Sequence, residues 1–133
     1  MASKDRLILF VCGENTFRSV LSEAMFNAEA PAGWSARSAG VRAGKKVNPI
    51  VEWLLREIGI DGWKTQPEKA TPAAIDESAR VVTFGCVDEC PAGISGKGED
   101  WPIPGSTGKS DDELRTIRDE LRRRIRDLIY RLR

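Results

Sequence analysis

The chain contains no histidine among its 133 residues. This absence excludes the catalytic arrangements in which an imidazole activates a serine or a cysteine, and it removes the usual ligands of most zinc sites. The longest apolar run, from Leu7 to Cys12, falls far short of the roughly 20 residues that a membrane helix needs. Residues 1–6 are polar and do not lead into a signal-peptide pattern. We therefore expect a cytoplasmic protein with no membrane partner.

Neither sign of charge dominates, because 21 basic and 20 acidic residues leave a formal net charge of +1. Such a balance creates no long-range field that would recruit nucleic acid. Arginines are frequent between residues 115 and 131, but acidic residues are interleaved with them, which is typical of a solvated helix face. We expect no nucleic-acid partner. The length suits a single domain over residues 1–133, and we expect a monomer.

Cysteine is scarce and odd in number, with only Cys12, Cys86 and Cys90. An odd count suits a disulfide framework poorly and suits redox or catalytic chemistry better. Two other interpretations of Cys86 and Cys90 remain open at this point. They can have a purely structural role, or they can form half of a metal site.

Hydrophobic patterning predicts strands that alternate with helices. Apolar runs predict strands at residues 6–12, 34–38 and 79–84 and a short one near Trp101, while periodic apolar positions and capping residues predict helices at 19–30, 48–59, from 71 and from 110. The last of these begins with a capping box, Ser110 to Glu113. This alternation predicts an α/β fold, with a four-stranded parallel sheet flanked by helices.

The segment from Cys12 to Ser19 is the sharpest functional feature, because it follows a predicted strand and opens a predicted helix. In that position the backbone N–H groups and the helix N-terminus can converge on one anion. Arg18 can grip two oxygens of the anion, and the same field stabilises a thiolate at Cys12. Ser19 can donate to that thiolate, and the Asn15 amide can brace the loop. The alternative is a buried cysteine at the end of a strand. The predicted oxyanion-binding residues are Gly13, Glu14, Asn15, Thr16, Phe17, Arg18 and Ser19.

These motifs resemble the low-molecular-weight tyrosine phosphatase family and, within it, the thioredoxin-coupled arsenate reductases. The resemblance covers nearly the whole chain. Besides the Cys12 loop it rests on Ser38-Ala-Gly40, Val47-Asn-Pro49, Glu57 to Asp61, Val81 to Cys86, Cys90-Pro91, Trp101 and Arg118 to Glu120. The loop alone indicates the superfamily, whereas the cysteine pair that follows the third strand indicates the reductases.

The resemblance implies a relay of three cysteines. Cys12 attacks arsenate while Arg18 and the loop amides hold its oxygens. Cys86 then attacks the Cys12 sulfur, releasing arsenite, and Cys90 resolves the Cys12–Cys86 disulfide to Cys86–Cys90. Thioredoxin or a similar dithiol reduces that bond. Arsenate reduction is accordingly the first interpretation. The alternatives are a phosphotyrosine or phosphoester phosphatase that uses Cys12 and Arg18, and a non-catalytic oxyanion-binding or redox protein.

The sequence departs from the family pattern in three places. The family's general-acid aspartate is missing near Pro104-Gly105, and Glu14 replaces a glycine in the loop, where we expect its carboxylate to point away from the anion. Some relatives bind potassium through side chains that match Asn15, Glu23, Ser38 and Thr65, but the aspartate of that set matches Pro67. We therefore predict that no cofactor is required and assign no potassium ion.

Overall fold

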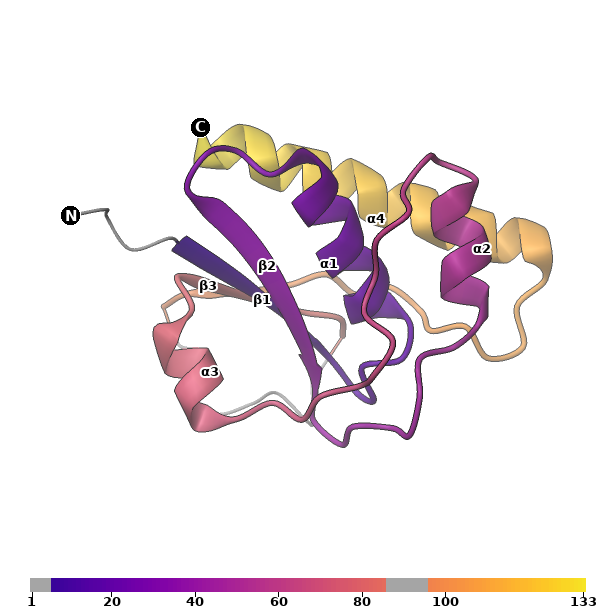
Figure 1. Cartoon of the computed structure of the whole chain (residues 1–133), viewed down its shortest axis with the longest axis horizontal. Coiled ribbons are helices and arrows are strands. Elements are labelled where there is room, and N and C mark those ends of the chain that lie inside the picture. The colour runs from indigo at the N-terminus through magenta and orange to yellow at the C-terminus, as the bar shows by residue number, and fades with distance from the viewer. Residues whose placement is uncertain (1–5, 86–95) are drawn as a thin grey trace.

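The computed structural model describes residues 6–85 and 96–133. It contains a parallel sheet of four strands in the order β2-β1-β3-β4 (Figure 1). The strands are β1 (Arg6–Cys12), β2 (Trp34–Gly40), β3 (Arg80–Thr83) and β4 (Gly98–Asp100). The predicted fold class is confirmed. The second strand is longer than predicted, since Ala39 and Gly40 continue the pairing with Val11 and Cys12.

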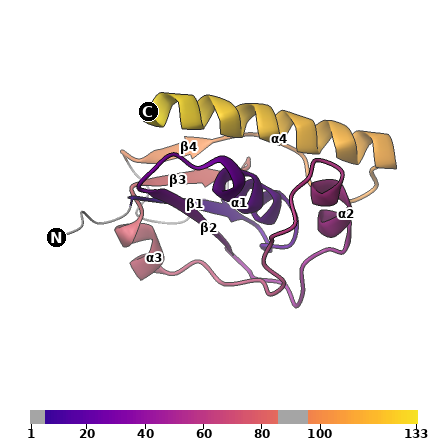
Figure 2. The same cartoon turned by 45° about the horizontal axis from the view of Figure 1, so that its top comes forward.

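Helices cover both faces of the sheet. Figure 2 shows α1 (Arg18–Glu29), α2 (Ile50–Arg56) and α4 (Asp111–Leu132) on one side, and α3 (Pro72–Glu77) on the other. Within the described residues, none of these helices is at once long enough and apolar enough to cross a membrane.

The buried residues of β1 alternate between two hydrophobic clusters. Ile8, Phe10 and Cys12 face α1, α2 and α4, whereas Leu9 and Val11 pack with Ile75 of α3. This alternation is the period of two that a strand imposes on its side chains. It also decides the direction of the Cys12 side chain, which lies on the same face of the sheet as α1.

Local capping residues act as the sequence predicts. Thr71 accepts a hydrogen bond from the Ala74 amide at the start of α3. Ser110 and Glu113 form the capping box of α4. Asn48 precedes α2 and accepts from the Ile50 amide through its side chain. These bonds satisfy amides that would otherwise lack partners at the helix starts.

Candidate active site

The Cys12 loop lies where the connections of the sheet diverge. From β1 the chain passes to β2 on one side, and β3 lies on the other side of β1. In open α/β sheets ligands bind at such a switch point, outside the carboxyl ends of the strands. Cys12 is the last residue of β1 and Arg18 is the first of α1, so the loop between them fills this position.

Backbone hydrogen bonds to residues 41–48 fix the direction of the loop peptides. The carbonyl groups of residues 12, 13, 14 and 16 accept from the amides of residues 41, 42, 44 and 48, at 2.8–3.0 Å. In a planar trans peptide the N–H group points opposite to the C=O group. The N–H groups of Gly13, Glu14, Asn15 and Phe17 therefore point away from this outer wall and towards the interior of the loop. This geometry is that of an anion cradle.

A chain of side-chain contacts connects the loop to the thiol. Ser19 Oγ lies 2.9 Å from Cys12 Sγ, and Asn15 Nδ2 donates to Ser19 Oγ at 2.8 Å. Either atom of the Ser19–Cys12 pair can be the donor when Cys12 is a thiol; a thiolate has no proton, so the Ser19 hydroxyl is then the donor. The structure thus places Ser19 beside the thiol and Asn15 beside Ser19.

At Asn15 the backbone of the loop packs closely against Gly40, at the end of β2. Asn15 is fully buried and has a positive φ of 58°, a conformation that asparagine tolerates better than most residues. A Cβ atom at Gly40 would lie 2.7 Å from the Asn15 nitrogen and 2.7 Å from the Glu14 carbonyl carbon. Only glycine therefore allows the end of β2 to approach the cradle this closely.

Replacing Gly40 with alanine should displace the cradle. We expect Gly40→Ala to lower the free energy of unfolding by about 1–3 kcal/mol, because a methyl group is forced against backbone atoms. It should also weaken the binding of inorganic phosphate. The matched control is Gly62→Ala, where a Cβ atom would meet nothing within 4 Å and the change should stay within about 0.5 kcal/mol. Urea unfolding and phosphate titration measure both quantities, and equal phosphate affinity in the two variants would contradict this account of Gly40.

Arg18 closes the cradle and connects it to two other strands. Its Nη1 atom donates to the carbonyl oxygens of Phe84, at 2.9 Å, and Ile103, at 2.8 Å. These residues follow β3 and β4. The bonds fix the plane of the guanidinium, whose further N–H donors can then bind an oxyanion without a large loss of side-chain entropy.

Cys12 and Arg18 line an open pocket of about 320 Å³. The other lining residues come from the loop, from Arg42 and from the segment that follows β4; they are Gly13, Glu14, Thr16, Phe17, Arg42, Gly105, Ser106 and Thr107. The structure therefore brings together Cys12 and most of the predicted oxyanion-binding residues. Asn15 and Ser19 lie behind the loop, as buried supports for it.

Among the described residues that line this pocket, Glu14 supplies the only carboxylate. Its side chain is exposed, and its Oε1 lies 3.6 Å from the position that a Cβ atom would take at Gly44. Asp100 does not line the pocket, because its Oδ1 accepts from Thr83 Oγ1 at 2.6 Å and from the Gly85 amide at 2.8 Å. Near Pro104-Gly105, where the family's acid is expected, the described lining of the pocket presents Gly105 and Ser106 and no carboxylate.

Two site residues were missed by the sequence analysis. Arg42 lines the pocket, and its position just beyond β2 could have indicated this, since parallel strands end at the same edge. Lys64 donates through Nζ to Asn15 Oδ1 at 3.0 Å and to the Ser38 carbonyl oxygen at 2.9 Å. Nothing local to Lys64 in the sequence indicates these contacts.

The side chains that match potassium ligands in some relatives lie around this lysine. Ser38 donates to Glu23, and burial raises the pKa of the Glu23 carboxyl, although Ser38 and the Lys64 charge oppose that shift. Thr65 is exposed. In the described part of the chain, no group of three or more acidic or cysteine side chains is arranged to hold a metal ion.

Cys86 and Cys90 lie outside the described residues. The described chain reaches Gly85, just beyond β3, and resumes at Gly96, before β4. Gly85 has a φ of +77° and its amide donates to Asp100. The segment with both cysteines therefore begins at the carboxyl end of a strand that neighbours β1, at the same edge as Cys12.

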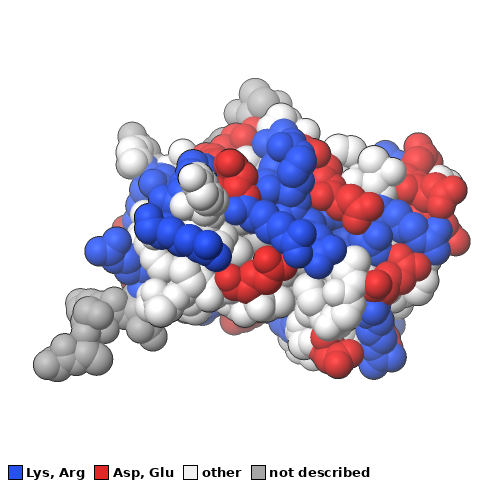
Figure 3. Space-filling view, turned by 90° about the horizontal axis from the view of Figure 1, so that it is seen from above, with Lys and Arg blue, Asp and Glu red and all other residues white. Residues whose placement is uncertain are grey.

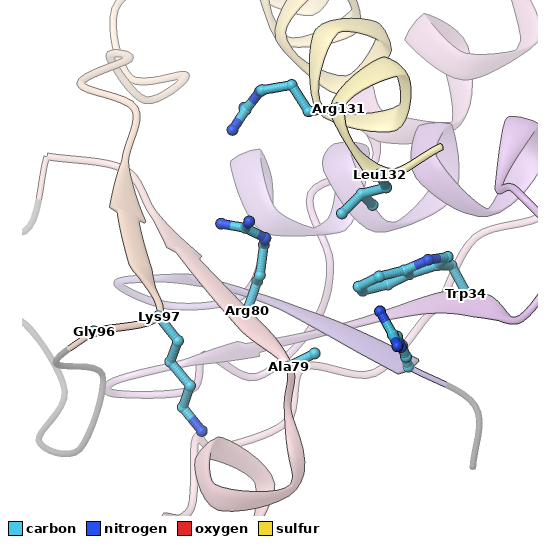
Figure 4. A pocket seen from close by; sticks show the side chains of 8 residues that line it. Trp34, Ala79, Arg80, Gly96, Lys97, Arg131 and Leu132 are labelled. Atoms are coloured by element: carbon cyan, nitrogen blue, oxygen red, sulfur yellow. The ribbon is translucent and has the colours of Figure 1, made fainter. Parts of the chain in front are cut away.

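A second pocket, of about 380 Å³, lies at the opposite edge of the sheet (Figure 4). Arg6, Trp34 and Arg80, at the starts of three strands, contribute to its lining. Several of its basic groups are engaged with the protein. Lys97 Nζ extends to carbonyl oxygens at the end of α3, and Arg131 pairs with Glu99. We assign no ligand to this pocket.

Most of the arginines of α4 also pair with acidic neighbours. Glu120 accepts from Arg123 and Arg124, which holds the pKa of its carboxyl at about 2. Figure 3 shows basic and acidic side chains interspersed over this face. Such mixing is typical of a solvated surface.

The chain is similar to proteins of two related activities. An arsenate reductase from Archaeoglobus fulgidus is 34% identical over 92% of this chain and 98% of its own, with a TM-score of 0.77. A thioredoxin-dependent arsenate reductase from Corynebacterium glutamicum is 31% identical, with a TM-score of 0.80; 96% of this chain matches, but it spans only 62% of that protein. An arginine phosphatase from Geobacillus stearothermophilus is 26% identical over 96% of this chain and 92% of its own, with a TM-score of 0.82.

The family comparison agrees with these structures and with the geometry of the Cys12 loop. The model described as low molecular weight phosphotyrosine protein phosphatase matches residues 7–133. The chain belongs to the low molecular weight phosphotyrosine protein phosphatase family.

Proposed function

We propose that the protein is an arsenate reductase with Cys12 as its nucleophile. The observation that carries the proposal is the Cys12 thiol at the end of β1, within contact of Ser19 and beside a loop whose amides face inwards. Arg18 borders the same pocket. Relatives at 31% and 34% identity that are named arsenate reductases support the choice of arsenate over other tetrahedral oxyanions.

The first step is attack of the Cys12 thiolate on arsenic. A sulfur–arsenic bond forms, and the bond from arsenic to a hydroxyl group of arsenate breaks; that hydroxyl takes up a proton from solvent and leaves as water. The loop amides and Arg18 stabilise the negative charge of the remaining oxygens. The leaving oxygen is small and is readily protonated by solvent, so this step depends less on a dedicated general acid than does the expulsion of a phenolate.

The second step reduces arsenic, and it uses the predicted roles of Cys86 and Cys90. The Cys86 thiolate attacks Cys12 Sγ, so that a disulfide forms while the sulfur–arsenic bond breaks. The bonding electron pair stays on arsenic, which becomes As(III) and leaves as arsenite. The Cys90 thiolate then attacks Cys86 and releases the Cys12 thiolate. The two electrons gained by arsenic come from the pair of thiols.

An external dithiol must reduce the Cys86–Cys90 bond for a second turnover. We propose thioredoxin or a protein of similar chemistry for this step. The dependence of the Corynebacterium glutamicum relative on thioredoxin supports this choice. Such a cycle requires no cofactor, and it belongs in a reducing compartment such as the cytoplasm. We propose that the enzyme acts as a monomer.

The decisive experiment measures arsenite release with thioredoxin and its reductase, in parallel with the hydrolysis of aryl phosphates. Thioredoxin-dependent arsenite release over many turnovers supports the reductase. Phosphoester hydrolysis without arsenite release would identify a phosphatase. Binding of oxyanions without either turnover would leave the third interpretation, a binding or thiol–disulfide protein.

A phosphatase is the second candidate, because the family model and the cradle suit a phosphoryl group equally well. The observation against efficient hydrolysis is the described pocket lining, which has no carboxylate near Pro104-Gly105, where the family's acid is expected. We expect phosphoester hydrolysis to be about 10²–10⁴ times slower than in relatives that carry the acid. The rate should depend steeply on the acidity of the leaving phenol, and a flat dependence at high turnover would show that another group supplies the proton.

The position of Gly105 allows this explanation to be tested by restoring an acid. A Cβ atom there would meet only Arg18, at 3.9–4.0 Å, which is ordinary van der Waals contact. Gly105→Asp should accelerate hydrolysis of phosphates with poorly acidic phenols and change activated substrates little. The matched control is Gly105→Asn. An equal effect of both substitutions would mean that the carboxyl proton is not involved.

A further inference from the structure

The charged end of Lys64 is enclosed by oxygens beside the Cys12 loop. Its side chain is only 13% exposed. Nζ donates to Asn15 Oδ1 at 3.0 Å, to the Ser38 carbonyl oxygen at 2.9 Å and to Glu68 Oε1 at 2.6 Å. An ammonium thus has one acceptor for each of its N–H bonds. Lys64 is therefore held in one orientation, against the rear of the anion cradle.

The contacts from Lys64 continue without a break to the thiol. Asn15 Oδ1 accepts from the ammonium, Asn15 Nδ2 donates to Ser19 Oγ, and Ser19 Oγ lies beside Cys12 Sγ. Every donor in this chain can point towards the sulfur. A hydrogen bond to the oxygen of an amide polarises its N–H group, and each bond in such a series is strengthened by about 10–30%. The arrangement allows the Ser19 hydroxyl to donate to a thiolate at Cys12.

The same contacts hold the shape of the loop. Asn15 Oδ1 also accepts from the Glu68 amide at 2.8 Å, so two groups of one segment clamp a single oxygen. Asn15 has a left-handed backbone, and its side chain is the part of the loop that reaches this segment. Loss of the ammonium would leave a buried amide oxygen with one fewer donor, which weakens the restraint on the amide plane.

The charged groups at the Lys64 end of this series of hydrogen bonds differ from those at the Cys12 end. Lys64 faces the carboxylates of Glu23 and Glu68, and its hydrogen bond lowers the pKa of the Glu68 carboxyl. At the other end, the pocket beside Cys12 is lined by the charged groups Glu14, Arg18 and Arg42. Lys64 is thus the cation on the buried side of the loop, whereas the arginines border its open side.

We propose that Lys64 is a positioning residue that holds Asn15 and Ser19 in the donor arrangement that stabilises the Cys12 thiolate. Its tethered ammonium supplies a positive charge between Asn15 and Ser38. The proposal rests on the proposed function only in taking Cys12 as the nucleophile. It therefore applies equally to arsenate reduction and to phosphoester hydrolysis.

The test is the pH dependence of Cys12 alkylation by iodoacetamide. Trypsin releases Cys12 in the peptide 7–18, which contains no other cysteine, so its modification can be followed by mass spectrometry. In Lys64→Met we expect the midpoint of the profile to rise by about one pH unit, which corresponds to roughly tenfold slower alkylation below the midpoint. The control is Lys69→Met, an exposed lysine of the same segment, which should leave the profile unchanged.

Adding a small cation to a variant that lacks the lysine tests whether the charge of Lys64, and not only its bulk, acts on Cys12. In Lys64→Ala, potassium or methylammonium chloride should return the midpoint part of the way to the wild-type value, whereas choline chloride at equal ionic strength should not. The wild type should respond to none of them. Lys64→Gln, which keeps N–H donors without the charge, replaces Lys64→Met if the latter does not fold.

A wild-type profile in any folded Lys64 variant would overturn the proposal, and so would a wild-type enzyme whose alkylation depends on potassium. The readout involves no arsenate. A protein that fails to reduce arsenate but shows the Lys64 effect would therefore refute the proposed function and leave this inference intact.

Discussion

Replacing Cys12 with serine should abolish arsenite release and phosphoester hydrolysis together. Both reactions begin with attack by this sulfur, and a serine hydroxyl at the same position has no neighbouring imidazole to activate it, because the chain contains no histidine. Removing an essential nucleophile from a preorganised site typically costs roughly 10⁴–10⁶ in rate. We expect the activity of Cys12→Ser to fall below detection in steady-state assays of either reaction.

The fold and the cradle should survive this substitution. Cys12 is 8% exposed and already lies 2.9 Å from a hydroxyl group, so a serine can make the same contact. Thermal unfolding and the binding of inorganic phosphate should therefore resemble those of the wild type. Retention of either activity, with phosphate binding intact, would show that another group is the nucleophile and would remove the basis of the proposed function.

The parts of this site that could be predicted from the sequence are those encoded by neighbouring residues. A strand, a polar turn and an amphipathic helix follow one another between Arg6 and Glu29, and their order alone places Cys12 at the head of a cradle. The capping box at Ser110 is similarly local. In both cases the interacting groups are only a few residues apart, so the chain has few other ways to satisfy them.

The supports of the site come from distant residues and could not be predicted in this way. Lys64 contacts Asn15 across 49 positions, and the amides of residues 41–48 orient the loop only after β2 has paired with β1. The end of β2 was placed too early, since Ala39 and Gly40 indicate a turn when taken alone. In the structure, Gly40 is required because Asn15 lies against it. Its role becomes clear only when both segments are in place.

The proposed three-cysteine relay predicts all-or-none outcomes for the variants of Cys86 and Cys90. In a single turnover without reductant, Cys90→Ser should still release one equivalent of arsenite per enzyme. It should then stop with a Cys12–Cys86 disulfide, because the resolving thiol is absent. Cys86→Ser should release no arsenite, because no thiol then attacks the sulfur that carries arsenic.

Tryptic peptides distinguish these states directly. Cys12 lies in peptide 7–18, and Cys86 and Cys90 both lie in peptide 81–97. A Cys12–Cys86 disulfide therefore joins the two peptides, whereas a Cys86–Cys90 disulfide lies within the second and lowers its mass by two hydrogen atoms. The oxidised wild type should show the internal bond, and Cys90→Ser should show the cross-linked pair.

Phosphoester hydrolysis provides the internal control for both variants. That reaction requires only the cradle, Cys12 and Arg18, so Cys86→Ser and Cys90→Ser should keep whatever hydrolysis the wild type has. A loss of hydrolysis in either variant would indicate damage to the site instead of a break in the relay. If Cys86→Ser reduces arsenate over many turnovers while hydrolysis is unchanged, the relay is refuted, and a phosphatase or an oxyanion-binding protein becomes the better account of the cradle.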